Sequence, residues 1–151
     1  VALINQYRFD NRRAPEGIFE VLALQPLHWA SGMHIALAPT TPVPLATYSE
    51  GSPWRAATLE ALNAAGRSYD FAYVSASYES LCSSVLAGFG ITALPDWDMD
   101  GRFVILDGTC GLPPLPQVRT VLKTAASSAV LRQFCDFIMQ LPFFKNLRPR
   151  A

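Results

Sequence analysis

Two serine-containing loops offer groups that could hold an anion. Residues 49–52 read Ser-Glu-Gly-Ser and residues 75–77 read Ser-Ala-Ser, and each stretch runs directly into a segment with a helical pattern. Unpaired N–H groups at the start of a helix carry a partial positive charge, and serine hydroxyls beside them add hydrogen-bond donors. These residue types therefore suit reversible binding of a small anion such as a carboxylate.

The same serines also have a simpler explanation. Ser52 and Ser77 stand where an N-cap is expected, and a serine cap stabilises its helix by about 1 kcal/mol. Glu50 would oppose an anion unless its carboxylate turns away or accepts a hydrogen bond from the ligand. Arg55 and Arg67 are residue types more typical of a solvated helix surface. The pattern leaves the helix cap and the anion site open as alternatives.

Other chemistries find no support in the sequence. There is no Gly-x-Gly-x-x-Gly, no phosphate-loop lysine and no serine in a nucleophile elbow. His28 and His34 have no cysteine or carboxylate companions at the spacing of a zinc site. The stretch "DWDMDG" resembles part of a calcium loop, with Asp96, Asp98 and Asp100 alternating, but it lacks the glutamate at the far end. We therefore expect neither a metal nor a cofactor.

The order of elements predicts where the two loops lie. The chain reads strand, small polar loop, helix, glycine and strand, with strand patterns at residues 44–48, 69–74 and 89–94. Helices are expected over residues 53–65 and around Leu81 and Val85, ended by Gly66 and Gly88. This is the βαβ pattern of a parallel sheet, and right-handed crossovers place both loops at the carboxyl ends of their strands, where ligands bind.

The rest of the chain supplies further strands and one helix. Strand patterns cover residues 1–4, 21–30, 102–107 and 118–124, while residues 38–44 and 111–116 are proline-rich connections. The final helix is expected to begin after a serine cap and to stop at Pro142. It carries a broad apolar stripe of Val130, Leu131, Phe134, Phe137, Ile138 and Leu141.

Composition excludes several classes of protein. Half of the 151 residues are apolar, which fits one compact domain, and twelve basic residues balance twelve acidic ones, so this chain should not bind nucleic acid by itself. No stretch reaches the ~18 apolar residues of a membrane helix, and no signal-peptide pattern is present. Cys82, Cys110 and Cys135 are odd in number and far apart, which suits reduced thiols in the cytoplasm.

The order of the predicted elements and the spacing of their motifs resemble a known family. The stretch "PLATYSEGSPWRAATLEALNAAGRSYDFAYVSASYESLCSSVLAGFGITALP" resembles the effector-binding domain of LysR-type transcriptional regulators. It contains "LEALNAAG", then "Y-x-S-x-S", then a helix ending in "V-x-A-G-x-G-I-x-x-L-P". The flanking stretches "VALIN", "LQPLHWASG" and "GLPPLPQVRTVLK" fit as well, so the resemblance covers nearly the whole chain.

The resemblance implies an α/β fold with two lobes, like that of type II periplasmic binding proteins, joined by two crossing strands. Lobe II would be complete and cover residues 32–117, and lobe I would be partial, from residues 1–31 and 118–151. The family's N-terminal winged helix-turn-helix and the first strand-helix-strand-helix portion of lobe I are expected to precede this chain.

The implied function is to sense a small organic molecule, as part of a bacterial transcription regulator. An effector bound between the lobes would modulate DNA binding by the winged helix-turn-helix. The expected contacts from lobe II are Ser49, Glu50, Gly51, Ser52, Trp54, Ser75, Ala76 and Ser77, with Asn5, Gln6 and Tyr7 from lobe I. Backbone N–H groups of residues 51–54 would hold the anion. Trp54 is expected in the core or cleft floor rather than stacked on a ligand, and the orientations of Tyr78 and Glu79 stay open.

Two other functions are open to the same fold. A solute-binding protein of a transport system is disfavoured by the three unpaired cysteines, and an enzyme would need convergent acid and base groups, for which Glu50 alone is insufficient. We expect no catalysis and no membrane partner. Apolar faces of residues 1–4, residues 118–122 and the last helix would lack packing partners, which predicts self-association as a dimer or larger oligomer.

Overall fold

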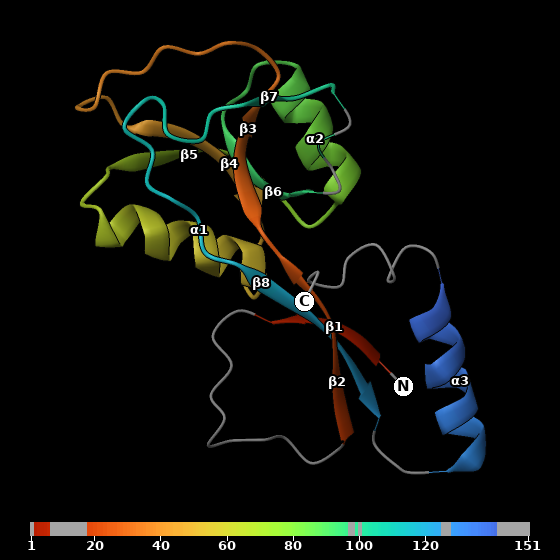
Figure 1. Cartoon of the computed structure of the whole chain (residues 1–151). Coiled ribbons are helices and arrows are strands. Elements are labelled where there is room, and N and C mark those ends of the chain that lie inside the picture. Colours follow the sequence, from red (N-terminus) through yellow and green to blue (C-terminus); the bar gives the residue numbers. More distant parts are fainter. Residues whose placement is uncertain (1, 7–17, 97–98, 100, 125–127, 142–151) are drawn as a thin grey trace. The chain divides into compact units, whose positions relative to one another are not determined.

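The computed structural model describes the chain except for residues 1, 7–17, 97–98, 100, 125–127 and 142–151 (Figure 1). The predictions for Tyr7, Asp98, Asp100 and Pro142 lie outside the described residues. The elements are β1 (Ala2–Gln6), β2 (Ile18–Gln25), β3 (Leu27–Ser31), β4 (Val43–Tyr48), α1 (Pro53–Ala64), β5 (Tyr69–Ser75), α2 (Tyr78–Leu86), β6 (Thr92–Pro95), β7 (Val104–Ile105), β8 (Val118–Thr124) and α3 (Ala129–Gln140).

The chain divides into two compact units. One consists of residues 26–116, and the other combines residues 1–25 with residues 117–151. We refer to them as the central unit and the terminal unit.

The central unit contains the strands that carry both serine loops. Strand β4 pairs in parallel with β5, and β3 pairs antiparallel with β6 and β7. A parallel bridge from Leu45 to Ile91 joins the two sets, with the Ile91 N–H donating to the Pro44 carbonyl and the Ala46 N–H donating to the Ile91 carbonyl, both at 2.8 Å. The neighbouring strands therefore run β5, β4, residues 91–95, β3, β7.

Helices α1 and α2 cover opposite faces of these strands. Successive residues of a strand point to opposite faces, and Leu45 and Ala46 accordingly enter different clusters. On one face Leu62 of α1 packs with Trp29, Val43, Leu45, Ile91, Leu106 and Leu112. On the other face α2 packs with Ala30, Ala46, Tyr48, Leu94 and Phe103 through Leu81, Cys82 and Val85. The loops at the strand ends are thus supported by a closed core.

Glycines end both helices in the same way. Gly66 (φ +62°) and Gly88 (φ +87°) adopt the left-handed conformation just after the C-caps of α1 and α2. The next N–H reaches back to the helix in each case, from Arg67 to the Leu62 carbonyl and from Phe89 to the Ser84 carbonyl, both at 2.9 Å. These bonds satisfy helix carbonyls that would otherwise lack partners.

Two strands are shorter than the sequence predicts. The strand expected over residues 89–94 is observed as Thr92–Pro95. Before it, Gly90 (φ +141°) approaches the Pro44 carbonyl so closely that a Cβ would lie 2.4 Å from its oxygen. The strand expected over residues 102–107 is limited to Val104–Ile105, between Gly101 and Gly108, which both have positive φ.

The expectation for Arg67 was wrong. Its side chain is buried at 7% exposure, and its guanidinium donates to the carbonyls of Ala38, Pro39, Thr41 and Cys110. Residues 38–42 contain prolines and form no strand or helix, so their carbonyls need a donor from elsewhere. Arg67 supplies that donor from the far end of α1.

The terminal unit has its own sheet and helix. Strand β8 lies between β1 and β2 and pairs antiparallel with both. Ser128 caps α3, with the Leu131 N–H donating to its Oγ at 3.1 Å. The prediction that residues 118–122 lack packing was wrong, because Val118, Val121 and Leu122 are at most 2% exposed. On α3, by contrast, Val130 (74%), Phe134 (49%) and Phe137 (62%) are exposed.

Candidate functional site

The two serine loops lie side by side at the carboxyl ends of β4 and β5. Tyr48 and Ser75, the last residues of these strands, are partners in the parallel ladder. The Ser49 N–H continues the ladder by donating to the Ser75 carbonyl at 3.0 Å. The sequence prediction that both loops open at one edge of the sheet is therefore confirmed for the strand ends.

The loop before α1, residues 49–52, is a tight turn that ends in a helix cap. Gly51 has φ +86°, and the Ser52 N–H donates back to the Ser49 carbonyl at 3.4 Å. The Ser52 Oγ accepts from the Arg55 N–H at 3.5 Å, and the Ser52 carbonyl accepts from the Ala56 N–H at 3.0 Å. The predicted N-cap is confirmed, and this role leaves other groups of the loop for a ligand.

Few N–H groups of this loop remain for an anion. The Ser49 N–H is used by Ser75 and the Ser52 N–H by Ser49, and Pro53 has none. Within residues 51–54 the candidate donors therefore narrow to the N–H groups of Gly51 and Trp54, and the hydroxyl of Ser49 adds another. Of the backbone N–H groups of residues 51–54 that were expected to hold the anion, only those of Gly51 and Trp54 stay candidates.

The loop before α2, residues 75–77, uses its hydrogen-bonding groups internally. The Ser77 N–H donates to Ser75 Oγ at 3.0 Å, and the Ser80 N–H donates to Ser77 Oγ at 3.3 Å, so Ser77 is also an N-cap. The Ser77 hydroxyl donates to Glu79 Oε2 at 3.0 Å. These bonds occupy the Ser77 and Ser80 N–H groups and the Ser77 hydroxyl, which an anion at this helix start would otherwise use.

Charge distinguishes the two helix starts. Glu79 lies in the first turn of α2, and its pKa is lowered by a hydrogen bond to backbone N–H and by the Ser77 hydroxyl. A carboxylate already present at this positive end repels a second anion. The first turn of α1 holds no acidic residue and instead contains Arg55. Glu50 precedes the α1 cap and is exposed, so the contrast lies in the first turns, where α1 carries Arg55 and α2 carries Glu79. This contrast favours an anion at α1 over one at α2.

Arg55 was expected on a solvated helix surface, and it instead makes two specific contacts. Its Nη1 donates to the Tyr48 carbonyl at 3.0 Å, and its guanidinium carbon lies 4.5 Å from the centre of the Phe71 ring. Phe71 in turn meets Tyr69 edge to face at 5.5 Å. Sequence reasoning missed this contact because Phe71 lies on the next strand and no local spacing links it to Arg55.

The other predicted site residues take varied positions. Glu50, Gly51 and Ala76 are exposed. Trp54 packs against the α2-side cluster with its ring centre 5.0 Å from that of Tyr48, as expected for a core or floor residue. Its buried Nε1 has no hydrogen-bond acceptor among the described residues. Asn5 and Gln6 lie in β1 of the terminal unit.

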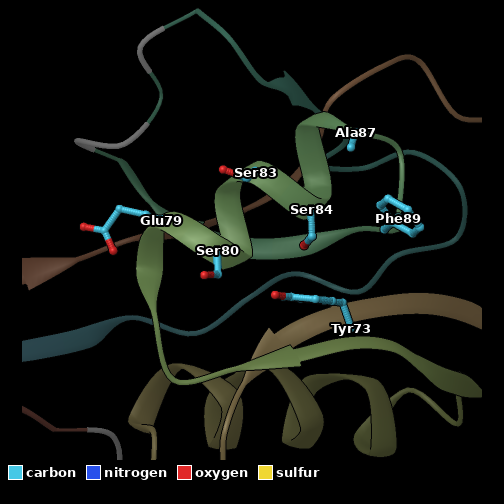
Figure 2. A pocket seen from close by; sticks show the side chains of 7 residues that line it. All are labelled: Tyr73, Glu79, Ser80, Ser83, Ser84, Ala87 and Phe89. Atoms are coloured by element: carbon cyan, nitrogen blue, oxygen red, sulfur yellow. The ribbon is translucent and has the colours of Figure 1, made fainter.

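A hollow in the central unit is lined by Glu79 and by none of the expected contacts of lobe II. It measures about 500 Å³ and is lined by Tyr73, Glu79, Ser80, Ser83, Ser84, Ala87 and Phe89. Figure 2 shows Tyr73 extending from β5 towards Ser80 and Ser84 on α2. Ser84 already donates to the Leu81 carbonyl at 2.8 Å. The hollow therefore offers fewer polar groups to a ligand than its serines suggest.

His28 has carboxylate neighbours that the sequence spacing did not indicate. Its Nδ1 lies 2.5 Å from Asp107 Oδ2 and its Nε2 lies 3.4 Å from Asp96 Oδ1. The second oxygen of Asp107 accepts from the Trp29 N–H at 2.7 Å. Within the described ranges, no three histidine, cysteine or acidic side chains gather as a metal site would require. In the same part of the chain, no helix is long and apolar enough to cross a membrane.

Comparison with known proteins gives consistent matches. The family model of the LysR substrate binding domain matches residues 19–141. The HTH-type transcriptional regulator PecT of Dickeya dadantii (strain 3937) is 32% identical over 102 residues, which is 68% of this chain and 32% of PecT. The chain thus spans about a third of the length of this curated relative.

Two solved structures show the same fold. The bromide-bound regulatory domain of HypT from Salmonella typhimurium matches with a TM-score of 0.69 at 23% identity, over 92% of this chain and 71% of that one. The regulatory domain of Synechocystis PCC6803 CcmR in complex with 2-PG matches with a TM-score of 0.68 at 16% identity, over 97% and 75%.

Proposed function

The chain belongs to the LysR substrate-binding domain family, and from this premise we propose that it binds a small organic anion at the loop before α1. It is the effector-binding domain of a LysR-type regulator, with the expected α/β fold related to periplasmic binding proteins. The matched relatives are transcriptional regulators, so a transport function is not favoured. Transcriptional regulators are also not enzymes, so catalysis is not favoured either.

The observation that carries the proposal is the contrast between the two helix starts. The start of α2 holds the Glu79 carboxylate and a serine network that is internally satisfied. The start of α1 has no acidic residue in its first turn, has Arg55 beside it, and offers the Gly51 and Trp54 N–H groups and the Ser49 hydroxyl. A carboxylate fits these donors in charge and hydrogen bonding.

The relatives add support for a small anion. The HypT domain was solved with a bromide ion, and the CcmR domain with 2-PG. Both have the fold of this chain. An organic carboxylate is the ligand class that we propose here, because it combines one negative charge with two acceptor oxygens for the N–H and hydroxyl donors.

We assign the wider site as two lobes. Residues 32–117 would form lobe II, and residues 1–31 and 118–151 would contribute to lobe I. Ser75, Ala76 and Ser77 would form the neighbouring wall. Preferential binding to a closed form of the lobes would then alter DNA binding by a winged helix-turn-helix of the same protein.

The protein would sense a small molecule and would not catalyse a reaction. The protein would act in the cytoplasm, where its cysteines stay reduced. It would self-associate as a dimer, and the exposed stripe of Val130, Phe134 and Phe137 on α3 supports association because such apolar surface favours contact with another protein surface.

A thermal-shift screen with small carboxylates, amino acids and aromatic acids tests the anion site. A ligand present at a hundred times its Kd stabilises the protein by about 2.7 kcal/mol. We expect the shift to vanish in the double variant Ser49→Ala, Ser52→Ala. The variant Ser128→Ala is the matched control, because it removes an N-cap of the same kind from α3.

The control and the double variant should separate capping from binding. Each loses about 1 kcal/mol for a missing cap, but Ser128→Ala should keep the full ligand shift. The anion site at α1 would be refuted if the ligand shift survived in the double variant. It would also be refuted if the Ser128→Ala variant lost the shift to the same extent.

A further inference from the structure

We propose that Arg55 is the positioning residue that holds the loop of residues 49–52 in its binding conformation. The inference rests on the proposed anion site and adds a residue outside the predicted contacts. Arg55 is the third residue of α1, and its side chain returns to the end of the preceding strand, where Nη1 donates to the Tyr48 carbonyl at 3.0 Å. The Arg55 side chain therefore links the first turn of α1 to Tyr48, and the loop lies between these two residues.

The backbone of Arg55 closes the same segment a second time. Its N–H donates to the Ser52 Oγ, so the residue contacts both the start and the end of the loop. Between these points Gly51 has a positive φ, and the Ser52 N–H makes a long bond of 3.4 Å to the Ser49 carbonyl. The loop has few internal restraints, so a restraint from outside has a large effect on its conformation.

The Phe71 ring fixes the orientation of the guanidinium. A planar guanidinium stacks on an aromatic face, and its centre here lies 4.5 Å from the ring centre. Phe71 is itself packed edge to face on Tyr69, at 5.5 Å between ring centres. Arg55 thus also contacts a strand that is not part of the loop.

The other donors of the guanidinium meet no acceptor in the part of the chain that the structure describes. One residue of the first turn of α1 therefore carries a positive charge, with donors that remain for a ligand, at the Tyr48 carbonyl where the loop begins. The same side chain that shapes the loop also makes its surroundings favourable for an anion.

Arg67 offers a matched control at the other end of α1. It too is an arginine whose guanidinium donates to backbone carbonyls, but its partners lie in residues 38–41 and at Cys110, away from the loop. Replacing Arg67 should lower the Tm without changing the loop. Replacing Arg55 should change the loop more than the Tm.

Amide hydrogen exchange measured by NMR on the full chain tests the positioning role without a ligand. The amides of Ser49 and Ala56 bracket the loop, and the Leu81 amide makes the corresponding bond to Ser77 at the start of α2. We expect Arg55→Ala to accelerate exchange at Ser49 and Ala56 about tenfold relative to Leu81. Arg55→Lys should rescue only part of this, because lysine lacks the planar fork, and Arg67→Lys should leave the ratio unchanged.

Binding of benzoate and bromide, followed by chemical-shift titration of the same variants, separates the two proposals. We expect Arg55→Ala to weaken binding at least about tenfold while Arg67→Lys does not. Unchanged exchange at Ser49 and Ala56 in Arg55→Ala would overturn the positioning role. Accelerated exchange in a protein whose wild type binds neither probe would uphold the positioning role and refute the anion site for these probes.

Discussion

At the scale of single residues, Ser52 and Ser77 occupy the same N-cap position but serve different surroundings. Ser77 hydrogen-bonds to Glu79, whereas Ser52 borders Gly51 and Arg55. A serine before a helix therefore does not by itself indicate a ligand site. The charge in the first helical turn decides whether an anion is favoured there.

Glu79 should make stability depend on pH at the acidic end. Its pKa is lowered in the folded chain by backbone N–H hydrogen bonding and by Ser77. A group whose pKa is lower in the folded state contributes stability above its unfolded pKa, and this contribution is lost as the pH falls through the folded value.

We therefore expect the Tm difference between wild type and Glu79→Gln to shrink as the pH falls from about 5 to about 3. Thermal unfolding followed by circular dichroism at several pH values measures this difference. The explanation fails if the two proteins keep a constant Tm difference over that interval.

At the scale of elements, one glycine controls the junction between β4 and β6. Gly90 has φ +141°, and an added Cβ would lie 2.4 Å from the Pro44 carbonyl oxygen, which accepts the bridge bond from Ile91. A side chain at this position would separate β4 from residues 91–95. The core on both faces of the sheet depends on that contact.

We expect Gly90→Ala to destabilise the chain by about 3 kcal/mol or more, since it combines a disfavoured φ with a backbone clash. Gly66→Ala is the control, because Gly66 has φ +62° but no atom within 4 Å of an added Cβ. It should lose only about 1 kcal/mol. Urea unfolding of both variants gives the comparison, and equal losses would contradict the role assigned to the Pro44 contact.

The elements that local signals determine were predictable from the sequence. A serine cap, a proline at the first position and a following glycine mark α1, and its observed bounds of Pro53–Ala64 differ from the expected 53–65 by one residue. Alternating residues mark β8, which spans Val118–Thr124 as expected. In both cases the deciding interactions lie within a few residues of each other.

The elements and contacts that the sequence did not reveal depend on partners far along the chain. Gly90 approaches the Pro44 carbonyl, Arg55 contacts Phe71, and Arg67 contacts residues 38–41. His28 meets Asp107 across 79 positions. Local periodicity does not carry such information. The positions of the two serine loops could therefore be predicted, but the contacts of the charged residues around them could not.

At the scale of the whole molecule, the chain consists of two units, each with its own sheet. It belongs to a family of effector-binding domains and spans about a third of the length of the curated relative PecT. The exposed stripe on α3, formed by Val130, Phe134 and Phe137, belongs to the terminal unit. Apolar surface of this kind is expected to meet another surface.

We expect the double variant Phe134→Glu, Phe137→Glu to reduce self-association, because two charges cannot be buried in an apolar contact without a large desolvation penalty. Sedimentation equilibrium over a range of protein concentrations measures the mass. The control is Arg132→Glu, Gln133→Glu, which changes two exposed polar residues of the same helix. The stripe is not the contact if the phenylalanine variant keeps the wild-type mass while the helix stays folded.

An anion is proposed to bind at the start of α1 and not at the start of α2. The most direct measurement is an NMR titration of the full chain with a small aromatic carboxylate such as benzoate, followed at the backbone amides. We expect saturable shifts at Gly51 and Trp54, where N–H groups remain for a ligand, and little change at Ser80, whose N–H donates to Ser77 Oγ. Saturable shifts centred on Ser77 and Ser80, with Gly51 and Trp54 unmoved, would contradict it.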